Sequence, residues 1–176
     1  MGGVPTGVTV MTSGRDEKAE GMTANAIISV SLEPLMMLAS VHGEARINAR
    51  IRDERYFAIN ILAAEQEGLS RLFASPERSS GLPAVHSMGG GYGETGSPLV
   101  SGATAAIECE VQAIYPGGDH DLFLGRVVAI HRNDSQKAPL AFYRGAYPTL
   151  QEAKKAQETG AFMDSARGFD ARLKDW

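Results

Sequence analysis

The first half of the chain places its apolar residues in short runs separated by polar turns. Residues 8–12 form a β-branched run, and the polar residues 13–21 that follow include two glycines. Extended character returns over residues 22–32, and a third apolar run covers residues 35–41 after Glu33-Pro34. Runs of this length, bounded by turn residues, predict a meander of β-strands.

The spacing of the apolar residues then changes twice along the chain. Residues 45–54 carry two isoleucines four positions apart, with charged residues on the other faces, which predicts a short amphipathic helix. Residues 56–62 return to a strand pattern, and residues 65–73 have an apolar stripe at helical spacing. Residues 75–98 are rich in Ser, Gly and Pro and keep no period, so we expect a long loop there.

The second half shows the clearest strand pattern. In residues 105–115 apolar side chains alternate with polar ones, among them Glu108, which predicts a half-exposed strand. The residues Pro-Gly-Gly at 116–118 predict a turn, residues 122–130 a second strand, and residues 140–143 a further short strand.

The end of the chain predicts a different element. Thr149 and Glu152 have the spacing of a capping box, which predicts a helix that Gly160 ends. Strands dominate the rest and nothing repeats, so the pattern predicts a mainly β protein, a barrel with short helical insertions. We expect one domain over residues 1–150 and a C-terminal helical extension over residues 151–176.

Composition narrows the class of protein. The 176 residues carry a net charge of −4 and show no Lys/Arg cluster, which argues against a nucleic-acid partner. A single cysteine, Cys109, excludes an internal disulfide and indicates a reducing compartment. The first residues lack the basic and apolar regions of a signal peptide, and the apolar run 35–41 is far short of a membrane helix of ~20 residues. We therefore expect a cytoplasmic protein that does not enter a membrane.

The pattern argues against two familiar kinds of site. Residues 91–96 have the spacing of a dinucleotide-binding glycine loop, but Ser97-Pro98 follows them where that loop needs a helix. The four histidines are scattered, with no HExxH or CxxC pattern, so we expect no metal site. Cys109 lies among apolar strand positions, where a thiol behaves as a small hydrophobe.

Three segments carry candidate chemistry. Residues 21–34 place small hydrogen-bonding side chains along an extended backbone, which suits a planar heterocycle or, equally, a water-facing edge strand. Residues 40–48 combine a strand end, a helix start and Arg46, which suits an anion, although Glu44 would repel one; taken alone, the pattern favours an ordinary helix start with solvated charges. Residues 116–125 form either a plain hairpin or a glycine turn that lets a ligand approach the backbone beside a histidine.

Taken in order, these segments resemble the flavin reductase-like family with the FMN-binding split-barrel fold, the reductase partners of two-component flavin monooxygenases. The resemblance covers about residues 4–150. It is carried by these stretches: Pro5-Thr-Gly-Val-Thr-Val-Met-Thr12, Gly21-Met-Thr-Ala-Asn-Ala26, Ser29-Val-Ser-Leu-Glu-Pro34, Phe57-Ala-Ile-Asn-Ile-Leu62, Gly96-Ser-Pro-Leu99, Ile107-Glu-Cys109, Gly118-Asp-His120, Gly125-Arg-Val127 and Tyr143-Arg-Gly-Ala-Tyr147. Family members usually have a helix before this first stretch, where the given sequence has Met1-Gly-Gly-Val4, and His42-Gly-Glu44 departs from the usual phosphate loop.

The resemblance implies a split β-barrel, Greek-key-like, and a set of site residues. The flavin ring and ribityl chain would contact Thr6, Thr23, Ala24, Asn25, Ala26, Ser29, Val30, Ser31 and Tyr147. The flavin phosphate would lie at Ser40, Val41, Ala45 and Arg46, and the nicotinamide at Gly118, Asp119 and His120.

The implied activity is transfer of a hydride from NADH or NADPH to FMN or FAD, by a homodimer that supplies a partner monooxygenase. In this mechanism His120 positions the nicotinamide, and no nucleophile is needed. Two alternatives stay open: a flavin-binding redox module or sensor without turnover, and an oxidase of the pyridoxamine-phosphate type on the same fold.

Overall fold

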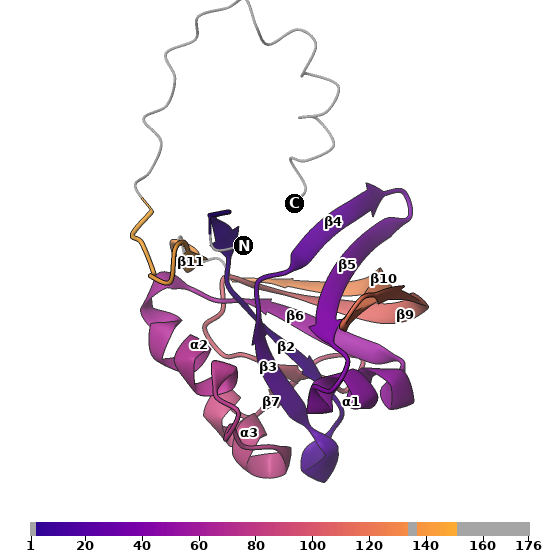
Figure 1. Ribbon diagram of the computed structural model, residues 1–176. Coiled ribbons are helices and arrows are strands. Elements are labelled where there is room, and N and C mark those ends of the chain that lie inside the picture. The colour runs from indigo at the N-terminus through magenta and orange to yellow at the C-terminus, as the bar shows by residue number, and fades with distance from the viewer. Residues whose placement is uncertain (1–2, 134–136, 151–176) are drawn as a thin grey trace, which may run out of the picture.

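The computed structural model describes residues 3–133 and 137–150, and its centre is one antiparallel sheet of seven strands (Figure 1). The strand order is β3-β2-β6-β9-β10-β5-β4. These strands are β2 (Thr9–Ser13), β3 (Glu20–Ala24), β4 (Ile27–Leu32), β5 (Leu35–His42), β6 (Tyr56–Ile61), β9 (Ala105–Gly117) and β10 (His120–Arg132). Two small pairs accompany it: β1 (Thr6–Gly7) with β11 (Ala141–Phe142), and β7 (Gly91–Tyr92) with β8 (Pro98–Leu99).

The sheet curls around the main core. Buried side chains from six of its strands, such as Met11, Phe57 and Phe123, meet in one cluster with Ile47 and Ile51 of α1 (Arg46–Glu54). Strands that lie apart in the sheet order can share one cluster only if the sheet closes around it. Among the described strands β3 pairs only with β2, and β4 only with β5, so the barrel is open between its edges. The predicted mainly β split barrel is confirmed.

Two helices cover the outer face of the sheet near β2. The 3-10 turn Ala64–Gln66 leads into α2 (Glu67–Ala74), and α3 (Gly81–Met88) follows. Their buried residues form a second cluster with Val8 and Val10, while Met11 of the same strand faces the barrel interior. Figure 1 shows both helices on one side of the sheet and the β4–β5 hairpin projecting on the other.

The predicted loop over residues 75–98 is wrong in its middle. Helix α3 occupies Gly81–Met88 and buries Ala84, Val85 and Met88. The pattern hid this helix because Pro83 lies inside it, but proline is tolerated in the first turn, where no amide needs a partner within the helix. After Gly96 the chain enters strand β8 and not a helix, which confirms that residues 91–96 are not a dinucleotide-binding loop.

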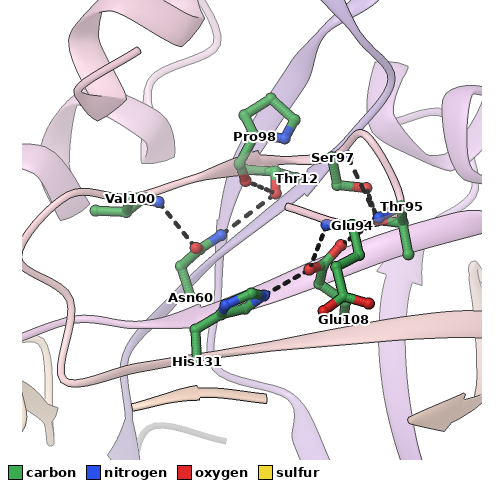
Figure 2. Close-up of polar contacts among 9 residues, drawn as sticks. All are labelled: Thr12, Asn60, Glu94, Thr95, Ser97, Pro98, Val100, Glu108 and His131. Atoms are coloured by element: carbon green, nitrogen blue, oxygen red, sulfur yellow. Dashed lines mark hydrogen bonds and ion pairs between the residues drawn. The ribbon is translucent and has the colours of Figure 1, made fainter. Parts of the chain in front are cut away.

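The alternation along β9 mispredicts Glu108, whose side chain is completely buried. The loop after β7 folds over it: the backbone N–H groups of Glu94 and Thr95 donate to its two oxygens at 2.9 and 2.7 Å, and the Thr95 hydroxyl donates as well. His131 Nε2 contacts the carboxylate at 2.6 Å (Figure 2). Alternation along a strand shows on which face of the sheet a side chain lies. It does not show whether a loop from elsewhere in the chain covers that face.

The same loop requires glycine at one position. A Cβ on Gly93 would lie 2.2 Å from a Glu108 oxygen, so a larger residue would displace the carboxylate. Next to this network, Asn60 accepts the Val100 N–H at 2.9 Å and donates to Thr12 (Figure 2). The loop is therefore attached to β9 and β6 by buried polar contacts.

The remaining predicted elements are confirmed with shifted ends. The extended residues 22–32 are two strands, β3 and β4, divided at residues 25–26, and β9 continues through Gly117, so the turn begins later than predicted. The helix predicted after Thr149 lies outside the described residues. Within the described ranges no helix is both long and apolar enough to span a membrane.

Candidate functional site

The connection between β3 and β4 lies between two cavities. Asn25 and Ala26 form this connection and are both exposed, and Asn25 lines a cavity of about 330 Å³ on one side and one of about 190 Å³ on the other. Within the described residues the Asn25 amide makes no hydrogen bond. An amide that can both donate and accept is thus available at the junction of the two cavities.

The larger cavity has an apolar wall and one unsatisfied polar atom. Its lining is Pro5, Thr6, Gly7, Thr9, Asn25, Ile27, Met37, Ile59, Ile61 and Ile107. The Thr6 Oγ1 atom is buried and has no hydrogen-bond partner among the described residues. Because a buried hydroxyl without a partner costs about 1–3 kcal/mol, a ligand with a polar group at this position would be stabilised.

The smaller cavity is organised by a chain of hydroxyl groups. Thr23 Oγ1 donates to the Ser70 carbonyl at 2.7 Å, and the Ser70 hydroxyl is 2.9 Å from the Tyr147 hydroxyl. The Tyr147 ring meets Phe142 edge-on, with centroids 5.2 Å apart. Ala24 and Asn25 complete the predicted residues of this wall. The structure therefore brings four of the other predicted residues together around Asn25: Thr6, Thr23, Ala24 and Tyr147.

The end of β5 continues this surface. The Ser40 N–H donates to the Ala26 carbonyl at 3.0 Å, which fixes the β3–β4 connection against β5. Beyond Ser40, the residues Val41 and His42 pair only with β10 among the described strands. The Val41 side chain is buried in the core, so only its backbone can contact a ligand.

The start of α1 combines a bare helix end with two arginines. Ala45 caps the helix without a side-chain hydrogen bond, and the first turn has no acidic residue. Arg46 Nε lies 3.3 Å from a Glu20 carboxylate oxygen, and its Nη2 donates to the Arg78 carbonyl at 2.7 Å. Arg78 Nε donates in turn to the Gly21 carbonyl at 2.8 Å.

The two guanidinium groups are close enough for the charge of Arg46 to disfavour the charged form of Arg78. Burial, and then the charge of Arg46, lower the pKa of Arg78, while Glu20 acts in the opposite direction. One carboxylate between two guanidinium groups leaves a positive charge in excess. Together with the uncapped helix end, this excess favours an anion such as phosphate.

The β9–β10 turn lies beside the same helix start. Gly118 takes a left-handed φ of 81°, and the Asp119 carbonyl accepts the Gly43 N–H at 2.9 Å. His120 Nδ1 is 2.7 Å from Asp119 Oδ1, and this hydrogen bond is the main reason that the pKa of Asp119 is lowered. The turn therefore places the predicted Gly118, Asp119 and His120 next to the segment that leads into Arg46.

Three predicted residues lie away from this surface. Ser29, Val30 and Ser31 line neither cavity and lie further along β4, towards the tip of the β4–β5 hairpin.

The residues that the sequence prediction missed at the site include two with ionisable side chains. Arg78 lies in the Ser-rich segment that was predicted to be loop, and His42 was one of four scattered histidines. In the structure His42 is the cross-strand partner of His120. Pairing of residues this far apart in sequence leaves no local signal.

Cys109 has no part in the chemistry. It is fully buried in the barrel core, and burial followed by the nearby Glu108 charge raises the pKa of its thiol to about 12. The thiolate is therefore unavailable as a nucleophile near neutral pH, in agreement with its interpretation as a small hydrophobe.

Comparison with known proteins gives one consistent result. The flavin reductase like domain model matches residues 1–151. An NADH-dependent FMN reductase, AsuE2, from Streptomyces nodosus subsp. asukaensis is 42% identical over 152 residues, which are 86% of this chain and 82% of that protein. An NADH-dependent FAD reductase from Streptomyces globisporus is 42% identical over 160 residues, 89% of this chain and 87% of that protein.

A solved structure agrees in fold as well as in sequence. BorF, the flavin reductase component of a bacterial two-component tryptophan halogenase, superposes with a TM-score of 0.79 at 33% identity, covering 86% of this chain and 94% of BorF. The family model spans most of the chain, and these relatives match along most of their own length. The chain therefore belongs to the flavin reductase like domain family.

Proposed function

We propose that this protein is an NADH-dependent flavin reductase that binds FMN or FAD around Asn25 and delivers reduced flavin to a partner monooxygenase. The family, the NADH-dependent relatives and the two-component system of BorF support this activity. They favour a catalytic reductase over the alternative, a flavin-binding module that does not catalyse the reaction. NADPH is the second candidate hydride donor.

The residues at the site fit a flavin. A flavin joins a flat, largely apolar ring with polar edges to a polyol chain and a phosphate. The apolar wall of the larger cavity suits the ring. The Asn25 amide and the Thr6 hydroxyl, which have no hydrogen-bond partner in the part of the chain that the structure describes, suit its polar edge. The positive start of α1 suits the phosphate. The single observation that carries the proposal is the buried Thr6 hydroxyl, which has no hydrogen-bond partner among the described residues, in a mostly apolar cavity that Asn25 also lines.

The protein's contribution to the reaction is orientation. When bound, the flavin and the dihydronicotinamide supply the hydride chemistry themselves. His120 holds the nicotinamide: the Asp119 carboxylate accepts the proton of His120 Nδ1, and in the tautomer with its proton on Nδ1 the ring presents Nε2 as an acceptor. Stacking a donor ring against an acceptor ring at roughly 3–3.5 Å accounts for much of the rate enhancement.

The proposal extends to the assembly and the compartment. We infer a homodimer with the flavin at or near the subunit interface, because β4 is an edge strand that exposes Ile28 and Val30. A buried free thiol and a reduced nicotinamide co-substrate favour the cytoplasm. The residues beyond 150 form, in this proposal, a separate C-terminal extension.

A direct assay tests the activity and the site together. Wild-type protein is expected to oxidise NADH only when FMN or FAD is added, because the flavin is the hydride acceptor. Asn25→Ala is expected to weaken flavin binding by about 1–3 kcal/mol through loss of a hydrogen bond in the cavity. Steady-state absorbance at 340 nm and a flavin fluorescence titration measure the two effects. Flavin binding without NADH oxidation would identify a non-catalytic module, and equal affinity in Asn25→Ala would remove Asn25 from the site.

A further inference from the structure

We propose that His42 is a second nicotinamide-binding residue, which forms with His120 a donor–acceptor pair for the carboxamide group of NADH. The inference rests on the proposed function, because it takes NADH as the ligand. The two imidazole rings lie edge to face, with centroids 5.2 Å apart and planes at 79°. They come from adjacent strands, where His42 of β5 is the direct partner of His120 of β10.

Neighbouring groups fix opposite tautomers in the two rings. The Glu44 N–H donates to His42 Nδ1 at 3.2 Å, so Nδ1 carries no proton and the neutral ring has its proton on Nε2. The carboxylate of Asp119 accepts from His120 Nδ1 at 2.7 Å, so the neutral His120 ring has a bare Nε2. His42 therefore offers a donor where His120 offers an acceptor.

A primary carboxamide is complementary to this pair. Its carbonyl oxygen accepts and its NH₂ group donates, and the two lie side by side on one planar group. Two rings in contact can bond both atoms at once: His42 Nε2–H to the carbonyl, and the carboxamide N–H to His120 Nε2. An amide held at both atoms is fixed in rotation, which orients the ring to which it is attached.

The backbone beneath both histidines is rigidly held. The Asp119 carbonyl accepts the Gly43 N–H, which ties the β9–β10 turn to the residue after His42. The Asp121 carboxylate accepts from Arg52 Nη2 at 2.6 Å and from Asn48 Nδ2 at 2.9 Å, which joins β10 to α1. Binding groups on such a support lose little conformational entropy when the ligand arrives.

The test separates the two hydrogen bonds by changing the protein and the co-substrate together. Reduced 3-acetylpyridine adenine dinucleotide keeps the carbonyl acceptor of NADH but lacks the N–H donor. His42→Phe removes the donor while retaining a ring, and His42→Gln retains an N–H donor at the end of the side chain. His86→Phe, at an exposed histidine of α3, is the matched control. KM and kcat for each co-substrate, flavin affinity and Tm are measured on every variant.

We expect His42→Phe to raise KM about 3- to 10-fold for both co-substrates, the effect of one neutral hydrogen bond. Flavin affinity and Tm stay unchanged, and His42→Gln recovers most of the loss. His120→Ala raises KM for NADH but not for the analogue, which has no N–H to lose.

Normal NADH kinetics in His42→Phe, or a His42→Gln variant as impaired as His42→Phe, would overturn the role of His42 and leave the reductase activity standing. A loss that is the same in His86→Phe would also overturn it. Wild-type protein that never oxidises NADH in the presence of flavin would instead refute the proposed function, and the His42 inference with it.

Discussion

At the scale of single residues, Glu108 shows how a charge is kept inside the protein. Burial is the largest influence on this carboxyl group and opposes its ionisation, but hydrogen bonds from Thr95, His131 and Glu94 outweigh it. The pKa of Glu108 is therefore below its ordinary value of 4.5. Each of these hydrogen bonds gives the buried carboxylate a donor and gives that donor an acceptor. The loop over β9 and the carboxylate therefore stabilise one another.

Replacing this carboxylate by an amide tests that mutual dependence. Glu108→Gln turns one acceptor oxygen into an NH₂ group that faces an N–H donor, so we expect the free energy of unfolding to fall by about 2–4 kcal/mol. Urea unfolding with an unchanged m-value measures it. Glu110→Gln is the matched control on the same strand: its ion pair with Arg126 is partly exposed and worth about 0–1 kcal/mol. Equal losses in the two variants would contradict the account.

The same residue predicts a pH dependence of stability. Because its pKa is lower in the folded state, Glu108 contributes stability that is fully present above its unfolded pKa and lost as the pH falls through the folded value. We expect the Tm difference between wild type and Glu108→Gln to be constant above about pH 5 and to shrink below the ordinary pKa of 4.5. A difference that persists undiminished at pH 3 would show that the charge is not its source.

The sequence predicted the site residues that lie in short, distinctive segments. Asn25 and His120 could be proposed as site residues because polar residues on an extended strand and a histidine after a glycine turn are local signals. Glu108 was misassigned because its burial depends on residues 93–97, which only the fold brings near it. Arg78 and His42 were missed for the same reason: their partners are more than 30 residues away.

At the scale of elements, α1 and the segment after α2 together form the phosphate end of the proposed site. Helix α1 begins without a capping side chain, although such a cap is usually worth about 1 kcal/mol. The segment after α2 supplies Arg78, whose Nε and Nη1 are bonded to the carbonyls of Gly21 and Ser75. A phosphate here would cap the helix and relieve the repulsion between Arg78 and Arg46.

Removing Arg78 should affect only flavins that carry a phosphate. We expect Arg78→Ala to weaken FMN binding about 10-fold, as a charge-assisted hydrogen bond of roughly 1.5 kcal/mol or more would. Riboflavin, which has no phosphate, should bind wild type and variant equally. Fluorescence titration with both flavins measures this, and Arg132→Ala, an exposed arginine at the other end of β10, is the control. Equal weakening of riboflavin and FMN would mean that Arg78 holds the fold and not the phosphate.

Element prediction succeeded where the pattern was strong and failed where a helix was short. The alternation in β9 and the isoleucine spacing of α1 each extend over enough residues to fix the type of element. Helix α3 has eight residues that include Pro83 and begin at Gly81, so its local propensity is poor. It forms because Ala84 and Met88 are buried against the second cluster, which is a tertiary effect that propensity does not report.

At the scale of the whole molecule, one edge of the barrel has no neighbouring strand among the described residues. Strand β4 is the outermost strand of the sheet, and Ile28 and Val30 expose 58% and 52% of their surfaces. An edge strand with exposed β-branched residues is prone to pair with another chain unless something covers it. The predicted flavin-binding residues Ser29, Val30 and Ser31 lie on this same strand, away from both cavities. A site at a dimer interface would explain both facts, because the strand of one subunit could then reach the flavin of the other.

We therefore expect sedimentation velocity at micromolar concentration to show a homodimer, and Ile28→Lys to shift it towards the monomer because a charge on this face would be buried without a partner. Flavin affinity should fall together with dimerisation, since the site would lose the residues of the second subunit. Leu82→Lys on α3 alters a comparably exposed apolar residue on another face and should leave both properties unchanged. A monomeric wild-type protein with full activity would refute the interface, whereas a dimer whose Ile28→Lys variant dissociates yet binds flavin normally would place the complete site within one chain.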